Sequence, residues 1–307
     1  MSRLFTFGCS YTSYSWPTWA DLAGMNYKLH KNWGMSGLGN RAIAERVAEA
    51  HAKYNFGPGD TVIVQWSSHL RNDWWHQNPT VSKYPGWQTC GSIFNYINEK
   101  IYTLEWIKTF FFEPAWIMHT LNHILLTQGL LKSTGADWYM TSIGDIRNLG
   151  ADIRDNDGIG EDTGFLTPRD KEILHVLWRK IPEMCVYDKP IWGDNQEHWL
   201  EPLELFAQKH AELTFQFDDT RKKGKTFYDT HPSTRQHTMW LDNQLKEKLQ
   251  LSDATMKTSW EIADSVDALQ KKFRFNKNLF ELNLAKRMGF PASAQRTLRW
   301  PFPSEGF

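Results

Sequence analysis

Hydrophobic positions along the chain form short continuous runs that alternate with longer segments of helical spacing. The continuous runs predict strands, over residues 3–7, 27–33, 61–66 and 137–143. The helical spacing predicts helices, over residues 17–23, 41–54, 93–132, 199–213 and 232–249. Because strands and helices alternate, the pattern predicts a three-layer α/β/α fold in which a parallel central sheet has helices on both faces.

Local signals refine these predicted elements. The run at residues 61–66 (TVIVQW) is almost wholly apolar, as in a parallel strand that is buried on both faces. Asn40 occupies the N-cap position of the 41–54 helix, and Pro114 is expected to bend the 93–132 helix. Residues 66–91 are polar and aromatic, so we expect them to be irregular, and residues 227–232 are expected to form a loop.

Two long segments do not follow the alternation of strands and helices. Residues 144–194 are rich in Gly, Asp and Pro around one helical piece at 168–180. Residues 252–307 begin with an amphipathic helix and end in a tail rich in proline and aromatic residues. We therefore predict a domain at 1–251 with an insert at about 69–225. A helical extension at 252–307 should follow it and pack on the core or on another copy of the chain, which makes self-association a candidate property.

Charge and composition narrow the function classes. Lys+Arg and Asp+Glu number 35 each, so the net charge gives no electrostatic footprint for nucleic acid or an anionic membrane. The apolar stretch at 106–118 is interrupted by Lys108, Glu113 and Pro114, which predicts no membrane span. The first residues do not resemble a signal peptide. The cysteines show no metal-type pairing or disulfide framework, which fits synthesis in a reducing cytoplasm; they are Cys9, Cys90 and Cys185.

A candidate nucleophile follows the first predicted strand. The segment FGCSYT presents the Ser10 hydroxyl on a sharp turn. A nucleophilic serine needs that exposure and a base that accepts its proton. Taken alone, the hexapeptide favours an ordinary turn or N-cap serine, because motifs this short match by chance.

Two further clusters offer the other groups that acyl transfer needs. In NWGMSGLGN, glycines let the backbone approach a ligand, so that the N–H of Gly37 can face an oxyanion; a plain glycine-rich connection is the alternative. In Asp229-Thr230-His231-Pro232-Ser233, the acid can orient the imidazole; a helix cap beside a surface histidine is the alternative. Ligands bind at the carboxyl ends of the strands in such sheets, and the candidates should gather at that edge.

Together these clusters resemble the SGNH (GDSL-like) hydrolase superfamily. Gly8-Cys9-Ser10 matches its first block with Cys in place of Asp, Gly37 lies in its glycine block, and His231-Pro232-Ser233 matches its last block. The series FGCSYT, WPTWADLAG and NWGMSGLGNRAI is similar to a variant found in marine phages and bacteria, which would allow a virion-associated protein. The resemblance covers residues 3–66, 137–143 and 225–249. It implies a flavodoxin-like fold with Ser10 as nucleophile, His231 as base and Asp229 as the third member of the triad, which orients His231.

The chain departs from the family pattern in two blocks. The acid lies two residues before His231 instead of three, so Asp218 or Asp219 remains an alternative to Asp229. The family's Gly-x-Asn block is absent in plain form. Ser67 or Ser68 falls near its Asn, whereas Asn72-Asp73 lies six residues past the strand. The resemblance implies an oxyanion hole from the N–H groups of Ser10 and Gly37, and either serine hydroxyl could supply a third donor.

The resemblance implies ester hydrolysis without a metal or organic cofactor. Candidate substrate contacts are Trp66, Arg71 and Asn40. Tryptophans near the insert favour an O-acylated or O-acetylated glycan, because indole faces stack on sugar rings; they are Trp66, Trp74, Trp75 and Trp87. Two alternatives stay open. One is a weak or inactive member that binds glycans or has a structural role, and the other is an O-acyltransferase with the same triad.

Overall fold

The central sheet has four parallel strands in the order β2-β1-β3-β6. The computed structural model describes residues 2–76, 86–94, 101–144, 198–218 and 225–288. The strands are β1 (Arg3–Phe7), β2 (Leu29–Asn32), β3 (Asp60–Trp66) and β6 (Asp137–Ser142). β3 pairs with β1 and β6 and is buried along its whole length, which explains why its sequence is apolar almost throughout.

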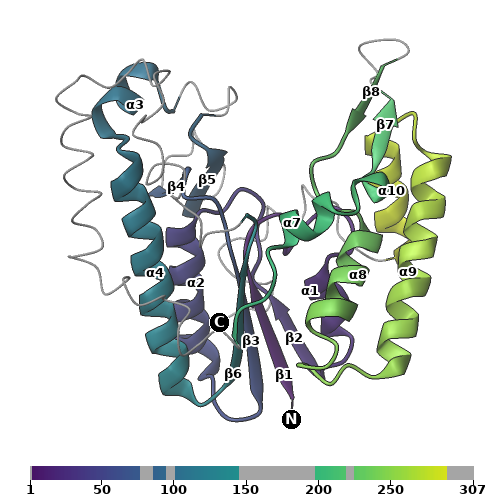
Figure 1. Ribbon diagram of the computed structural model, residues 1–307, viewed down its shortest axis with the longest axis horizontal. Helices are drawn as coiled ribbons and strands as arrows, with labels where there is room; N and C mark the ends of the chain where they lie inside the picture. The colour runs from purple at the N-terminus through teal and green to yellow at the C-terminus, as the bar shows by residue number, and fades with distance from the viewer. Residues whose placement is uncertain (1, 77–85, 95–100, 145–197, 219–224, 289–307) are drawn as a thin grey trace.

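Helices cover both faces of this sheet and complete three layers (Figure 1). α2 (Asn40–Tyr54) and α4 (Glu113–Thr134) pack together on one face. α1 (Trp19–Gly24) and α8 (Thr234–Gln244) cover the other face, and α9 (Asp253–Lys272) packs on α8. These layers confirm the predicted α/β fold with a parallel central sheet.

Shorter elements gather where the parallel strands end. β1 begins at the bottom of Figure 1, and two antiparallel hairpins lie near the top of the view. One hairpin pairs β4 (Arg71–His76) with β5 (Gly86–Ser92), and the other pairs β7 (Gln216–Asp218) with β8 (Thr226–Tyr228). The neighbouring helices are α3 (Leu104–Phe110), α7 (Leu203–Gln208), the 3-10 helix η5 (Ala211–Leu213) and α10 (Lys277–Met288).

Several predicted elements differ from those observed. The segment 66–91 was expected to be irregular but contains β4 and β5, because cross-strand pairing leaves little trace in so polar a sequence. The expected loop at 227–232 begins inside β8. Pro114 does not bend a long helix. It stands in the first turn of α4, where its missing N–H costs no hydrogen bond.

Helix and strand ends also shift. Gly39, and not Asn40, is the N-cap of α2. The predicted helix at 199–213 is reduced to α7 and η5, and the predicted helix at 232–249 ends with α8 at Gln244. The predicted strand at 27–33 is shortened to β2. The helical piece expected at 168–180 and the tail at 296–307 lie outside the described residues.

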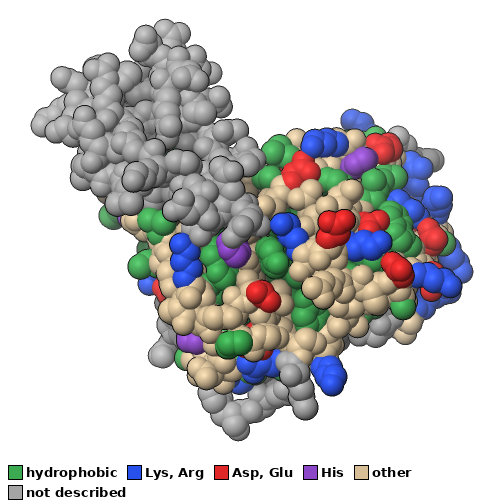
Figure 2. Space-filling view, turned by 60° about the horizontal axis from the view of Figure 1, so that its bottom comes forward, with side chains coloured by type: hydrophobic (Ala, Val, Ile, Leu, Met, Phe, Trp, Pro, Cys, Tyr) green, Lys and Arg blue, Asp and Glu red, His purple; other side chains and the backbone are tan. Residues whose placement is uncertain are grey.

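The first part of the 252–307 extension packs on the chain itself. Residues of α9 and α10 form an apolar cluster with Trp16 and with Phe215 and Phe217, which lie in and beside β7; the helical members are Val266, Leu269, Phe280 and Leu284. On the face shown in Figure 2, basic and acidic side chains of the described residues are interspersed, in keeping with the zero net charge. Among the described helices, none is long and apolar enough to cross a membrane.

Candidate functional site

Ser10 lies in a tight turn directly after β1. The N–H groups of Thr12 and Ser13 both donate to the carbonyl of Cys9, at 3.0 and 3.1 Å, and this closes the turn. A Cβ atom at Gly8 would lie 2.1 Å from Thr12 Oγ1 and 3.0 Å from the carbonyl oxygen of Gln65, so only glycine fits there. The strand end and the turn therefore fix where the Ser10 hydroxyl lies.

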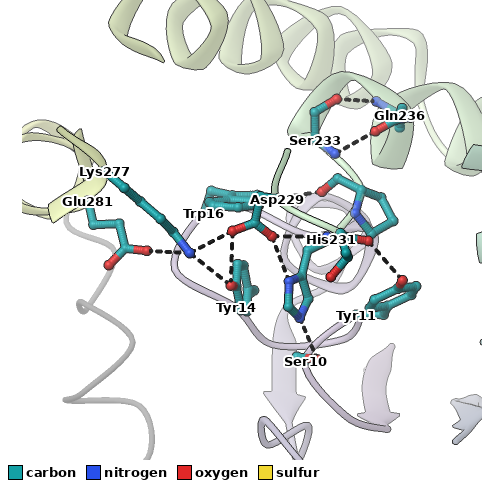
Figure 3. A network of polar contacts seen from close by, with 12 residues as sticks. Ser10, Tyr11, Tyr14, Trp16, Asp229, His231, Ser233, Gln236, Lys277 and Glu281 are labelled. Atoms are coloured by element: carbon teal, nitrogen blue, oxygen red, sulfur yellow. Dashed lines mark hydrogen bonds and ion pairs between the residues drawn. The ribbon is translucent and has the colours of Figure 1, made fainter. Parts of the chain in front are cut away.

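Ser10, His231 and Asp229 form a continuous chain of hydrogen bonds (Figure 3). Ser10 Oγ lies 2.9 Å from His231 Nε2, and His231 Nδ1 lies 2.7 Å from Asp229 Oδ1. The backbone N–H of His231 also donates to Asp229 Oδ1 at 3.0 Å. In this arrangement the imidazole can accept the serine proton while the carboxylate holds its other nitrogen.

Aromatic residues from the loop after Ser10 hold the histidine loop in place. Tyr14 stacks on the His231 ring with centroids 3.8 Å apart and planes at 18°. The Tyr11 hydroxyl donates to the Thr230 carbonyl at 3.0 Å, and the Trp16 indole donates to the Pro232 carbonyl at 2.8 Å. The loop after β1 thus carries the serine and also binds the segment that carries the base.

The Asp229 carboxylate is buried and ionised. Burial by itself would raise its pKa, but the hydrogen bond and charge of His231 and the ammonium of Lys277 outweigh burial and hold the pKa well below its usual range. Lys277 Nζ lies 2.6 Å from Asp229 Oδ2, the oxygen that does not face His231 Nδ1. Burial raises the pKa of the neighbouring Tyr14 to about 12, so this phenol stays neutral.

The structure distinguishes the two serines that follow β3. Ser67 is buried, and its hydroxyl has no hydrogen-bond partner among the described residues. Ser68 Oγ instead accepts the N–H of Leu70 at 3.1 Å. The Asn40 side chain accepts the N–H of Ser67 at 2.7 Å and donates to its carbonyl at 3.0 Å, which fixes the Ser67 backbone.

The glycine loop before α2 is braced by the β4–β5 hairpin. Gly37 has φ +83°, a left-handed conformation that favours glycine. Its carbonyl accepts the N–H of Gly91 at 3.3 Å, and Arg71 donates to the Leu38 carbonyl at 3.1 Å. Asp73 accepts the N–H groups of Gly39 at 2.9 Å and Ala42 at 3.2 Å, so the hairpin also caps the helix.

One predicted substrate contact needs correction. Trp66 is fully buried, and its indole N–H points at the Met140 sulfur at 3.4 Å, so it is a core residue and cannot reach a substrate. Asn40 borders a cavity, and its amide contacts Ser67 and the Thr120 hydroxyl; its substrate contact stays a prediction. Arg71 lines the same cavity, and its substrate contact stays a prediction.

Two cavities lie among the described residues of this region. A cavity of about 550 Å³ touches His231, Asp229 and Tyr11 and is otherwise bordered by α7, η5 and the neighbouring strands. A second cavity of about 370 Å³ lies between β4, α3 and α4, and its aromatic lining comes from Trp74, Trp106, Phe110 and Trp116. Trp75 and Trp87 lie in β4 and β5, and the structure does not describe their side chains.

Sequence reasoning missed four residues that contact the triad or its loop: Tyr11, Tyr14, Trp16 and Lys277. Tyr14 and Trp16 lie within seven residues of Ser10, and an aromatic-rich turn beside a candidate nucleophile was an available signal. No motif in the sequence around Lys277 indicates a contact with the site. Of the alternative acids, Asp218 lies in β7 with its carboxylate 3.5 Å from Arg274, and Asp219 is outside the described residues.

The site is a Ser–His–Asp chain at the carboxyl edge of a parallel α/β sheet. No group of three His, Cys, Asp or Glu side chains among the described residues could hold a metal ion.

No family model and no curated protein matches the chain. A solved structure of a member of the lipolytic protein G-D-S-L family from Veillonella parvula DSM 2008 is similar, with 13% identity and a TM-score of 0.37 over 78% of this chain and 94% of that chain. The evidence for function lies in the geometry of Ser10, His231 and Asp229.

Proposed function

We propose that the protein is an SGNH-like serine hydrolase that cleaves an ester through an acyl-enzyme on Ser10. The observation that carries this proposal is the pair of hydrogen bonds on His231. Nε2 lies 2.9 Å from the Ser10 hydroxyl and Nδ1 lies 2.7 Å from the Asp229 carboxylate. Three residues from two distant parts of the sequence meet with the geometry that proton transfer from serine to histidine requires.

The proposed reaction has two half-reactions. His231 Nε2 takes the Ser10 proton as Ser10 Oγ bonds to the ester carbonyl carbon, and a tetrahedral oxyanion forms. The C–O bond to the alcohol then breaks, and His231 returns the proton to the leaving oxygen. Water repeats the attack on the acyl-enzyme and releases the acid. Asp229 remains ionised throughout and stabilises the imidazolium.

The N–H groups of Ser10 and Gly37 are the proposed oxyanion donors. The Ser67 hydroxyl is the better candidate for the third donor, because it is buried and lacks a partner among the described residues, whereas Ser68 Oγ already accepts an N–H. Asn40 holds the Ser67 backbone from both sides. Removing one such donor typically costs about 2.7–4 kcal/mol of transition-state stabilisation.

The preferred substrate class is an O-acylated glycan. The 370 Å³ cavity combines indole rings, which stack on sugar faces, with hydrogen-bonding groups on Arg71, Asn72 and His119. These polar lining residues suit a hydroxylated ring better than a long acyl chain. In this proposal the glycan occupies the aromatic cavity, and the ester group lies at Ser10.

A second candidate function is glycan binding with little or no turnover. The observation that favours it is Ser67 in the place where the resemblance implies an asparagine, because a hydroxyl has one proton to donate and an amide has two. A site with weakened oxyanion stabilisation could bind an ester without cleaving it at a useful rate.

Hydrolysis assays with p-nitrophenyl acyl esters and acetylated sugars separate these functions. The hydrolase proposal predicts turnover by the wild type, loss of turnover in Ser10→Ala and His231→Ala, and near-normal rates in the control Ser68→Ala. Saturable binding of acetylated sugars by calorimetry, without turnover, would favour the binding protein. Equal rates in the wild type and Ser10→Ala would overturn the hydrolase proposal.

A further inference from the structure

A lysine from the C-terminal extension binds the side of Asp229 that faces away from the histidine nitrogen. The two carboxylate oxygens have different partners. Oδ1 accepts from His231 Nδ1 and from the His231 backbone N–H, at 2.7 and 3.0 Å. Oδ2 lies 2.6 Å from Lys277 Nζ and 3.5 Å from the Tyr14 hydroxyl. Both ends of the carboxylate are therefore held, and Figure 3 shows Lys277 to the left of Asp229, on the side away from Ser10.

The position of Lys277 is itself fixed by packing. The ammonium lies 5.4 Å from the centre of the Tyr14 ring and 5.6 Å from that of Trp16, and 3.5 Å from the Glu281 carboxylate. The side chain is 24% exposed. Phe280 and Leu284 of the same helix are buried against Trp16 and the β7 region. The docking of α10 thus delivers the ammonium to Asp229.

We propose that Lys277 is a positioning residue that orients the Asp229 carboxylate toward His231, so that the C-terminal extension completes the catalytic site. This inference rests on the proposed hydrolase function. A carboxylate bound at Oδ1 alone could rotate about its Cβ–Cγ bond, and each rotation would weaken its hold on His231. A charged partner on Oδ2 removes that freedom.

The alternative role for Lys277 is a structural ion pair that only anchors α10. The two roles differ in their electrostatic consequence. The titratable groups that face Lys277 are Asp229 and Tyr14 from other elements and Glu281 from its own helix. Removing the Lys277 charge takes one positive charge away from the Asp229–His231 pair, so the positioning role predicts that the acid limb of activity moves to higher pH. An anchoring role predicts lower stability with no such change.

The test compares Lys277→Met, Lys277→Arg and Lys286→Met. Methionine keeps apolar packing against Tyr14 and Trp16 but has no charge, and arginine restores the charge. Lys286 is an exposed lysine in the last turn of the same helix and provides the matched control. In Lys277→Met we expect kcat to fall on the order of 10-fold with little change in KM. The acid limb of the kcat/KM profile should move to higher pH, and Lys277→Arg should recover most of both effects.

A double-mutant cycle and an NMR titration complete the test. In an Asp229→Asn background, Lys277→Met should cause little further loss of kcat, because Lys277 no longer has a carboxylate to orient. If Lys277→Met lowers the melting temperature but leaves the acid limb and kcat as in Lys286→Met, the positioning role is wrong. A wild type without esterase activity would refute the proposed function instead. NMR titration of the His231 ring in the wild type and Lys277→Met would then still decide whether Lys277 is coupled to the histidine.

Discussion

At the scale of single residues, the site depends on how Asp229 divides its two oxygens between His231 and Lys277. Asp229 lies two residues before His231, and this short separation lets one carboxylate oxygen accept both the backbone N–H and the ring N–H of His231. The spacing that made Asp229 an uncertain acid in the sequence is therefore compatible with a tightly bound one.

Replacing this acid tests its role directly. In Asp229→Asn, the amide retains the volume of the carboxylate but loses the charge that stabilises the imidazolium. We expect kcat to fall on the order of 10³- to 10⁴-fold at neutral pH, with KM little changed. Steady-state kinetics measure this effect, and Asp218→Asn is the matched control on the alternative acid. A larger loss of kcat in Asp218→Asn than in Asp229→Asn would contradict the assignment of Asp229 as the acid.

The residues that the sequence could predict are those that follow strands or lie in family-like blocks. Ser10, His231 and Asp229 were predicted, and the structure brings them within hydrogen-bond distance. Lys277 could not be predicted, because its contact with Asp229 arises from the docking of a helix that no motif links to the site. Trp66 was misassigned because a strand's last residue can face the core as well as the ligand edge.

At the scale of elements, the β4–β5 hairpin holds the proposed oxyanion loop. Gly91 and Arg71 contact Gly37 and Leu38, and Asp73 contacts both Gly39 and Ala42. Burial raises the pKa of Asp73 to about 6, even though the N–H groups of Gly39 and Ala42 favour its charged form. No periodic pattern of apolar residues predicts this hairpin, because its pairing depends on backbone contacts.

Removing the Asp73 carboxylate should loosen both the helix cap and the glycine loop. We expect Asp73→Ala to lower the free energy of unfolding by about 1–2 kcal/mol, as loss of an N-cap acceptor does. It should lower kcat more than it raises KM, because the Gly37 N–H would lose its fixed position. Asp73→Asn keeps one acceptor and should show a smaller loss. Denaturant unfolding and kinetics check both effects, and unchanged kcat in Asp73→Ala would contradict the bracing role.

At the scale of the whole molecule, a buried and a partly buried histidine make stability depend on pH. Burial lowers the pKa of His237 to about 3 and that of His30 to about 4. These folded-state values lie below the unfolded value of about 6.5, so the stability is fully present above that pH and is lost as the pH falls. Asp229 acts in the same direction below about pH 4, whereas Asp73, with its raised pKa, opposes the loss between about pH 6 and 4.

We therefore expect the melting temperature to fall as the pH is lowered from 7 to 4. Each histidine that stays neutral in the fold contributes at most about 1.4 kcal/mol per pH unit to that loss. His237→Gln removes one titrating group, so its stability should change less steeply with pH, whatever its stability at pH 7. Thermal unfolding at several pH values measures the slopes, and identical slopes in both proteins would contradict this account.

The whole-molecule architecture was the most predictable level. Periodicity predicts a parallel α/β sheet because strands and helices differ in hydrophobic period, and the β2-β1-β3-β6 order agrees with that class. The way in which α10 approaches the triad depends on packing between Phe280, Leu284 and Trp16, and side chains so far apart in the sequence leave no local pattern.

The central claim is that Ser10 is a nucleophile activated by His231. Labelling with a fluorophosphonate probe, followed by intact-protein mass measurement, tests it most directly because the probe reacts with activated serines whatever the natural ester is. The account predicts one adduct on the wild type, none on Ser10→Ala and strongly slowed labelling of His231→Ala. A wild type that stays unlabelled, or a Ser10→Ala variant that is labelled equally, would contradict it.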